Sequence, residues 1–196
     1  KVEELLFRHE TDIFLPATAL WPLRPKPWPA LVMFDDTGRW SALRQSGWLA
    51  AVSRFLDRET DWAPAVVSVD LRGWGDSRVA PTAYDLAGWS GSDRAPVYLA
   101  AGLDDGLLGQ RVRDGVASIR WVMEQPGIDA RRVVVAGRGL GAVVALMSAT
   151  AVDGVAGVVY REGPVSIEAA VGADPMGWSL DIFQPNLLRH LDIPDL

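Results

Sequence analysis

Four short apolar runs in this sequence are each followed by residues that could do chemistry. The runs lie at 30–34, 65–69, 133–136 and 157–160. The residues that follow them, and that we take as candidates to line a cleft, are Asp35, Asp36, Arg72, Trp74, Arg138, Gly139, Leu140 and Glu162. Ligands of open parallel sheets bind at the carboxyl ends of the strands. We therefore expect these residues to converge although they lie far apart along the chain.

The segment Gly137–Gly141 has the glycine spacing of a sharp turn between a strand and a helix. In the pattern G-x-S-x-G, the central residue presents a nucleophile, and the small flanking residues let the helix approach the strand. Here the central residue is Gly139, so no acyl-enzyme can form at this position. Its neighbours Arg138 and Leu140 are not nucleophiles either. The spacing differs from G-x-G-x-x-G and follows at least three expected strands, which excludes a dinucleotide-binding turn.

A second glycine-containing segment, 70–77, reads D-x-R-G-x-G-x-S. With Gly137–Gly141, it resembles the α/β-hydrolase superfamily, where such a segment follows the fourth strand and the nucleophile turn follows the fifth. The stretch 107–146 is most similar to the acetyl xylan esterase-like group, and dienelactone hydrolase-like proteins share much of it. The resemblance covers nearly the whole chain. It implies a carbohydrate-esterase ancestry with no cofactor, and it favours a periplasmic or secreted location without fixing one.

The oxyanion site implied by this resemblance is altered. Relatives of this type carry a His-Gly pair after the third strand, where a backbone N–H stabilises the developing oxyanion. This chain has Asp35 and Asp36 there, and two carboxylates would repel an oxyanion. They could form a solvated turn that ends the strand and caps the next helix. Alternatively, they could bind hydroxyl groups or a cation in a repurposed cleft.

The catalytic acid and histidine of the superfamily follow its seventh and eighth strands, and this sequence stops about one helix beyond the sixth expected strand. We therefore expect a C-terminally incomplete hydrolase-like domain. We interpret His190 as a surface or packing residue, and Glu162 faces the cleft without a partner histidine. The serines on nearby loops, which have no recognisable base beside them, are Ser77, Ser90 and Ser92. No catalytic triad can be written.

The elements that must position these residues alternate between strand and helix. Beyond the four apolar runs, we expect strands at 3–8 and 12–20 and helices at 41–57, 107–125 and 140–150. This pattern predicts a single α/β domain over 1–196, a three-layer sandwich around a mostly parallel sheet. The hydrolase-like order is 1-2-4-3-5-6, with strand 2 antiparallel and the last two strands lacking. Residues 76–105 are expected to form a long loop.

Composition excludes several functions. The chain has 196 residues, a formal charge of −6, two histidines and no cysteine. It therefore has no disulfide, cysteine–zinc site, iron–sulfur cluster or catalytic thiol. His9 and His190 are too far apart for a local metal motif, so we expect no metal. The negative charge argues against nucleic acid, and no apolar run reaches the roughly 20 residues that span a bilayer.

Two functions remain open. The first is a non-catalytic hydrolase-like domain, a pseudoenzyme or subunit, that binds a partner chain or carbohydrate through the former cleft. The second is a carboxylic-ester hydrolase of the acetyl esterase type, completed by further chain. The run 155–159 would form an apolar edge strand, which residues 163–196 or another protein chain should cover. Arg138 either pairs with Asp35, Asp36 or Glu162, filling the place of an acyl group, or points to solvent.

Overall fold

The computed structural model describes residues 1–44, 47–48, 63–78, 91–173 and 177–196. In these residues, six strands form one sheet in the order β1-β2-β4-β3-β5-β6, which confirms the predicted order. Only β2 runs opposite to its neighbours. The strands are β1 (Val2–Glu10), β2 (Ile13–Leu20), β3 (Trp28–Asp35), β4 (Ala65–Val69), β5 (Ile128–Arg138) and β6 (Gly157–Arg161).

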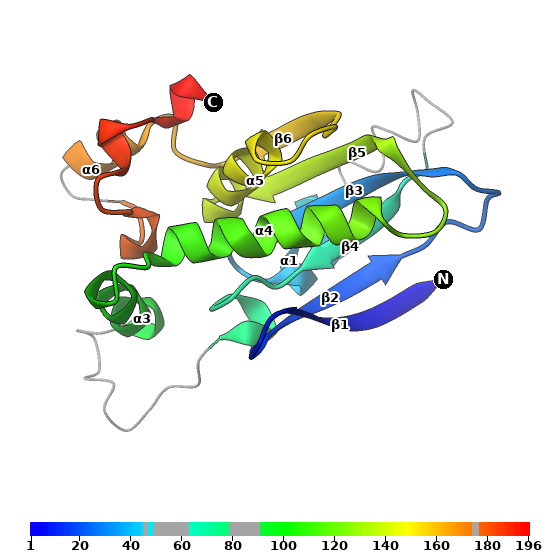
Figure 1. The fold of residues 1–196 in the computed structure, drawn as a ribbon, viewed down its shortest axis with the longest axis horizontal. Coiled ribbons are helices and arrows are strands. Elements are labelled where there is room, and N and C mark those ends of the chain that lie inside the picture. Colours follow the sequence, from blue (N-terminus) through cyan, green and yellow to red (C-terminus); the bar gives the residue numbers. More distant parts are fainter. Residues whose placement is uncertain (45–46, 49–62, 79–90, 174–176) are drawn as a thin grey trace.

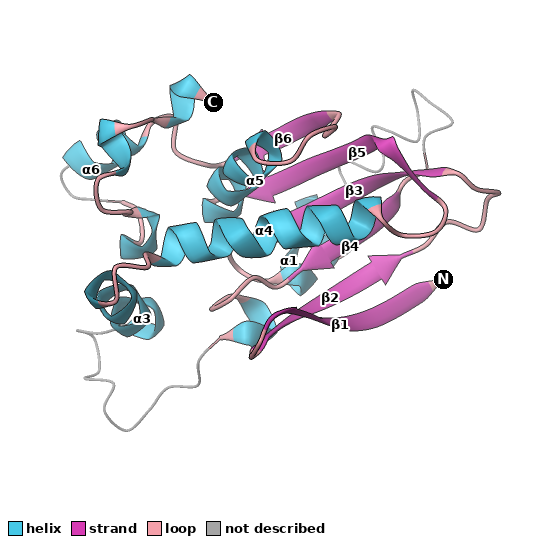
Figure 2. Ribbon diagram, viewed as in Figure 1, coloured by secondary structure: helices cyan, strands magenta, loops and turns pink. Residues whose placement is uncertain are grey.

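Helices cover both faces of this sheet, giving the three predicted layers (Figures 1 and 2). α4 (Leu107–Met123) and α5 (Leu140–Thr150) pack on one face, and α1 (Arg39–Leu43) packs on the other. α3 (Gly91–Gly102) and α6 (Ile167–Gly172) lie beyond the carboxyl ends of the strands. Within the described ranges, no helix is both long enough and apolar enough to cross a membrane.

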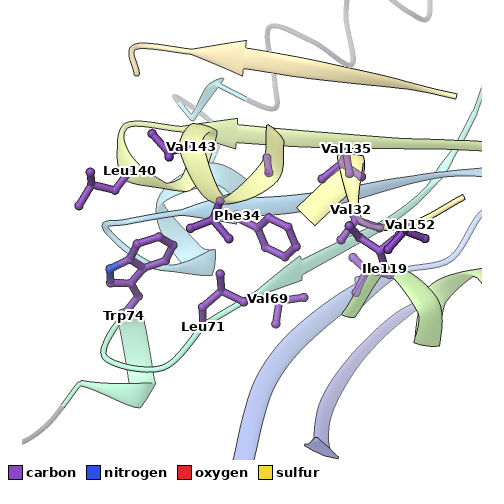
Figure 3. Close-up of a cluster of buried hydrophobic side chains, with 14 of the residues drawn as sticks. Val32, Phe34, Val69, Leu71, Trp74, Ile119, Val135, Leu140, Val143 and Val152 are labelled. Atoms are coloured by element: carbon purple, nitrogen blue, oxygen red, sulfur yellow. The ribbon is translucent and has the colours of Figure 1, made fainter. Parts of the chain in front are cut away.

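The alternation of β3 explains why its sequence is continuously apolar. Successive side chains of a strand point to opposite faces. Val32 and Phe34 therefore enter the cluster beneath α4 and α5 (Figure 3), while Leu31 and Met33 enter the cluster beneath α1. A strand buried on both faces has no polar side to show in its sequence.

Two glycines bring α5 into close contact with the strands that precede it. A Cβ added at Gly137 would overlap the backbone of Gly141, and one added at Gly141 would overlap the backbone of Phe34. The first turn of α5 is therefore packed directly on β5 and β3. This is the close approach that the glycine spacing predicts.

One expected element differs from the structure, and another is described only in part. The predicted loop 76–105 contains α3, so that prediction is wrong for residues 91–102. Its glycines and Pro96 obscure the helix in the sequence, but α3 packs against the 3₁₀ turn Leu180–Ile182, a contact that local sequence does not reveal. The helix expected at 41–57 overlaps α1 at its start, and its residues 45–46 and 49–57 lie outside the described ranges.

The C-terminal segment does not cover β6 as expected. Its residues Ile167, Ile182 and Ile193 are buried in the main core, and the segment lies beyond the carboxyl ends of the strands (Figure 1). In the described chain, β5 is the only strand that pairs with β6. The other expectation, that another chain covers this edge, stays a prediction.

Candidate functional site

The turn between β5 and α5 has the geometry of a nucleophile turn. Gly139 has φ 60° and ψ −129°, a backbone conformation that side-chain-bearing residues rarely adopt. Its N–H donates to the Arg161 carbonyl at 3.0 Å, and its own carbonyl accepts from the Ala142 N–H at 3.1 Å. The turn is thus fixed to β6 on one side and to α5 on the other. It is present in full, without a side chain at its tip.

The Asp36 carboxylate fills the space beside this turn. Its Oδ2 accepts a hydrogen bond from the Leu140 N–H at 2.9 Å. A Cβ added at Gly139 would overlap the same Oδ2. In the pattern G-x-S-x-G, the N–H after the nucleophile belongs to the oxyanion hole. One carboxylate therefore takes that donor and also crowds the position where a nucleophile would begin.

The electrostatic state of Asp36 reflects this enclosed position. Burial raises the pKa of its carboxyl above the ordinary value, and the nearby Asp35 carboxylate adds to the rise. The hydrogen bond from Leu140 and the charge of Arg138 act in the opposite direction. Burial outweighs them, so the turn holds an acid that is harder to ionise than a free aspartate.

Asp35 is fully buried, which contradicts a solvated turn at this position. Its Oδ2 accepts from the Trp48 indole Nε1 at 2.9 Å. Its Oδ1 accepts from the Thr37 backbone N–H at 2.9 Å and the Thr37 Oγ1 at 2.5 Å. Both oxygens thus have protein donors, so the alternative that Asp35 binds a hydroxyl or a cation has no support here.

Arg138 joins the carboxylates rather than pointing to solvent. Its Nη1 lies 3.3 Å from Asp35 Oδ2, and its Nε donates to Glu162 Oε2 at 2.8 Å. Glu162 Oε1 accepts from Arg161 Nε at 2.9 Å. The hydrogen bonds from Arg138 and Arg161 lower the pKa of Glu162. The Arg138 side chain is 29% exposed, so one of its sides still faces solvent.

That exposed side belongs to a pocket of about 330 Å³. The described residues that line it are Ser41, Arg44, Gly47, Trp48, Arg138, Arg161 and Glu162. Sequence reasoning missed Arg44, Trp48 and Arg161. Arg161 could have been found, because it ends β6 and thus stands at the same edge of the sheet as Arg138. Arg44 and Trp48 follow α1, and the strand pattern of the sequence does not predict where α1 lies.

Solved structures share this fold, although no family model and no curated protein matches the sequence. A candidate acetyl xylan esterase from Bacteroides fragilis NCTC 9343 superposes with a TM-score of 0.75 at 19% identity, over 99% of this chain and 55% of its own. The chain has the α/β-hydrolase fold. Its predicted resemblance to this superfamily is confirmed at the level of structure.

Two further structures show the same hydrolase fold. Acetyl xylan esterase 1 from Thermoanaerobacterium sp. JW/SL YS485 matches with a TM-score of 0.52 and 20% identity, over 85% of this chain and 53% of its own. A dienelactone hydrolase-like promiscuous phosphotriesterase, P91, from metagenomic libraries matches with a TM-score of 0.55 and 19% identity, over 83% of this chain and 59% of its own. The chain thus spans little more than half the length of these three hydrolase-fold structures.

Of the eight cleft candidates, Arg138 and Glu162 line the pocket, whereas Arg72 and Trp74 are held away from both the pocket and the turn. Arg72 turns toward α4, where its Nε donates to Asp114 Oδ2 at 2.8 Å and its Nη1 donates to Gln110 Oε1 at 3.0 Å. Trp74 is 2% exposed and lies in the core (Figure 3), with the Arg111 guanidinium 4.5 Å from its ring centroid. Both residues therefore hold the loop after β4 in place within the hydrolase fold.

The D-x-R-G-x-G segment has a structural explanation of its own. Asp70 is fully buried and accepts from the backbone N–H groups of Arg39 at 2.6 Å and Asp76 at 2.9 Å. It also pairs with the Arg39 guanidinium. Gly75 has φ 52°, and a Cβ there would overlap the Asp70 carboxylate. The motif thus closes the loop of the hydrolase fold around one buried acid.

The histidines do not complete a hydrolase site. His9 Nε2 lies 3.3 Å from Glu10 Oε1 and 3.9 Å from Asp114 Oδ1, on the side of β1 and α4. His190 is exposed in the C-terminal segment, as expected. Ser90 and the side chain of Ser92 lie outside what the structure describes. Among the described residues, no group of three or more His, Asp or Glu side chains could hold a metal ion.

Proposed function

We propose that this chain is a non-catalytic α/β-hydrolase-like domain of carbohydrate-esterase ancestry that binds a ligand in the pocket beside Arg138. The observation that carries the proposal is the position of Asp36. Its carboxylate accepts a hydrogen bond from the Leu140 N–H and occupies the place where the Cβ of a side chain at residue 139 would stand. The hydrolase fold is retained, while its reaction centre holds a fixed carboxylate.

Ester hydrolysis through this turn needs a nucleophile and a donor for the oxyanion. Gly139 supplies no nucleophile. The donor at Leu140 already binds the Asp36 carboxylate, and a substrate carbonyl would have to displace it. Arg138, held between Asp35 and Glu162, adds a second group fixed beside the turn. These groups favour a structural plug over a reaction site.

The pocket supports a binding role. Its volume of about 330 Å³ is at the small end of the range of ligand sites. Guanidinium, carboxylate and hydroxyl groups line it together with one side of Trp48. Such a lining suits a polar ligand such as a carbohydrate. A partner chain that inserts a polar side chain here is the other ligand class left by the sequence.

The alternative is a carboxylic-ester hydrolase completed by further chain. The retained turn geometry and the names of the neighbouring structures favour it. Under this alternative, Asp36 must leave the Leu140 N–H for the substrate, or must itself attack. Activity would then depend on Asp36, whereas a non-catalytic domain has no activity to lose.

The deciding experiment is turnover of p-nitrophenyl acetate by the unmodified chain and by Asp36→Asn. We expect neither to release nitrophenol continuously beyond the background rate, because acylation of the amines of Lys1 and Lys26 consumes each amine once and is not turnover. Arg131→Gln, altered at the opposite end of β5, serves as the matched control. Multiple turnover by the unmodified chain that persists in Arg131→Gln and is lost in Asp36→Asn would overturn the proposal.

A further inference from the structure

Three guanidiniums face the pocket beside Arg138, from three different elements. Arg138 ends β5, Arg161 ends β6, and Arg44 follows α1. Three cations that gather at one cavity repel one another unless anions offset them. The carboxylates around the pocket supply only part of the negative charge that would offset the three guanidiniums.

The carboxylates fix the guanidiniums but leave some of their donors unused. Glu162 takes the Nε of both Arg138 and Arg161, and Asp35 takes Nη1 of Arg138. Among the described residues, no protein acceptor bonds Nη2 of Arg138, the terminal nitrogens of Arg161 or the guanidinium of Arg44. Glu162 thus holds Arg138 and Arg161 in position while some of their N–H groups stay available to a ligand. Planar guanidinium groups match a carboxylate in charge and in geometry.

The local charge selects among anions. The three guanidiniums are opposed by Glu162 in the pocket wall and by Asp35 and Asp36 behind it, so the positive charge left for a ligand is small. A ligand with a single negative charge suits this small excess. A phosphate dianion would exceed it and would meet Glu162 at close range. The balance therefore favours a carboxylate.

The remaining lining suits hydroxyl groups on a compact ligand. Ser41 Oγ lies at the pocket, 3.5 Å from Arg138 Nη1, and the oxygens of Glu162 can accept hydrogen bonds. A volume of about 330 Å³ admits one sugar-sized ring rather than a chain of rings. We propose that the pocket binds a hydroxylated monocarboxylate of ring size, of the sugar-acid class. This inference rests on the proposed binding function and specifies its ligand chemistry.

The test compares three probes that share a ring but differ in charge. Glucuronate carries one carboxylate, glucose carries none, and glucose 6-phosphate carries a dianion at neutral pH. Titration calorimetry on the full chain at low ionic strength should show glucuronate binding at least about tenfold tighter than glucose. We expect glucose 6-phosphate to bind more weakly than glucuronate.

Variants assign any binding to the pocket. Arg44→Gln and Arg161→Gln should each weaken glucuronate binding at least about fivefold, because each removes one charged donor. Arg131→Gln is the matched control, since it removes an exposed arginine at the other end of β5 and should leave affinity unchanged. Thermal melts of each variant establish that the fold is intact.

The outcomes separate this inference from the proposed function. Equal affinity for glucuronate and glucose, tighter binding of the phosphate, or no loss in Arg44→Gln and Arg161→Gln would overturn carboxylate recognition. So would the absence of glucuronate binding. None of these results bears on the lack of catalysis, which p-nitrophenyl acetate turnover tests separately.

Discussion

Asp36 and Gly139 come from neighbouring strands and compete for one small volume. The carboxylate of one residue occupies the place where the side chain of the other would begin. The absence of a side chain at 139 is therefore more than the loss of a nucleophile, because it also makes room for Asp36. Arg138 and Glu162 add ion pairs at the rim of this arrangement. The four residues behave as one packed unit.

The competition predicts an energetic coupling between these two positions. Gly139→Ala should destabilise the chain by about 1–3 kcal/mol, because it adds a side chain at φ 60° and pushes against Asp36. In an Asp36→Ala background the overlap with the carboxylate disappears, so Gly139→Ala should cost at least about 0.5 kcal/mol less there. Urea unfolding of the four proteins measures the cycle. Strictly additive effects would contradict the overlap.

The raised pKa of Asp36 predicts a pH-dependent difference from Asp36→Asn. Its folded-state pKa lies above the ordinary value of 3.8, so the folded chain binds this proton more tightly than the unfolded chain does. The corresponding stability is fully present below pH 3.8 and is lost as pH rises through the folded-state pKa. Asn keeps an acceptor for Leu140 and does not titrate.

The free energy of unfolding of the unmodified chain, minus that of Asp36→Asn, should therefore increase as pH falls from 7 toward 4. Denaturant titrations of both proteins at matched pH measure this difference, and groups common to both cancel. A difference that stays constant, or that increases as pH rises, would show that the Asp36 pKa is not raised.

At the scale of elements, contact between backbones controls how α5 packs. Gly137→Ala places a Cβ against the Gly141 backbone, which cannot rotate away as a side chain can. We expect a loss of about 2–3 kcal/mol in unfolding free energy. Gly172→Ala, at a glycine of α6 with open space around it, should be neutral or stabilising by up to about 1 kcal/mol. Equal costs at both sites would contradict the close packing.

The strand order followed from the resemblance to the hydrolases, and the motifs that carry this resemblance are backbone requirements. Gly137 and Gly141 mark a close approach, and the D-x-R-G-x-G segment marks a loop closed around Asp70. Such requirements stay visible when side chains change. The convergence of Asp35, Arg138 and Glu162 followed in the same way, because the ends of adjacent parallel strands must meet.

The missed features depend on contacts between distant segments. α3 contains Pro96 and packs against a C-terminal turn, so its local sequence resembles a loop. Trp48, which follows α1, donates to Asp35 across 13 residues, and the strand pattern does not predict where the segment after β3 lies. Arg72 and Trp74 follow a strand as the rule requires, yet α4 offers Asp114 to the first and the core encloses the second. The rule that ligands bind at the carboxyl ends of parallel strands locates the end of each strand, but it does not predict in which direction a side chain there points.

At the scale of the whole molecule, a buried ion pair joins the C-terminal segment to α4. Arg111 and Asp181 are both almost fully buried, with side-chain exposures of 1% and 2%. Asp181→Asn should cost about 3–5 kcal/mol, because it removes a charged partner from a buried guanidinium. Asp105→Asn is the control, since its pair with Arg113 is half exposed and should be worth less than about 1 kcal/mol. Similar melting shifts for both variants would contradict this difference.

The outer edge of β6 predicts association between chains. No described strand pairs with that edge, and such edges pair readily with other strands. Gly157 has open space where a Cβ would stand, so Gly157→Lys adds a charge without a clash. Light scattering should show mass rising with concentration for the unmodified chain and a smaller rise for Gly157→Lys. Gly172→Lys, at an equally open glycine of α6, should behave like the unmodified chain. A mass that does not change with concentration would exclude this edge as a contact.

The overlap at Gly139 also constrains the order of events in a lineage. A mutation that restores serine at 139 meets the Asp36 carboxylate at once, so selection would act first on its harm to folding. Shortening residue 36 beforehand removes that obstacle, although it offers no catalytic benefit while 139 remains glycine. Neither mutation alone gives a benefit, and only the two together place a serine side chain in the turn without an overlap. The same geometry thus ties any exchange between glycine and serine at 139 to the side chain at residue 36.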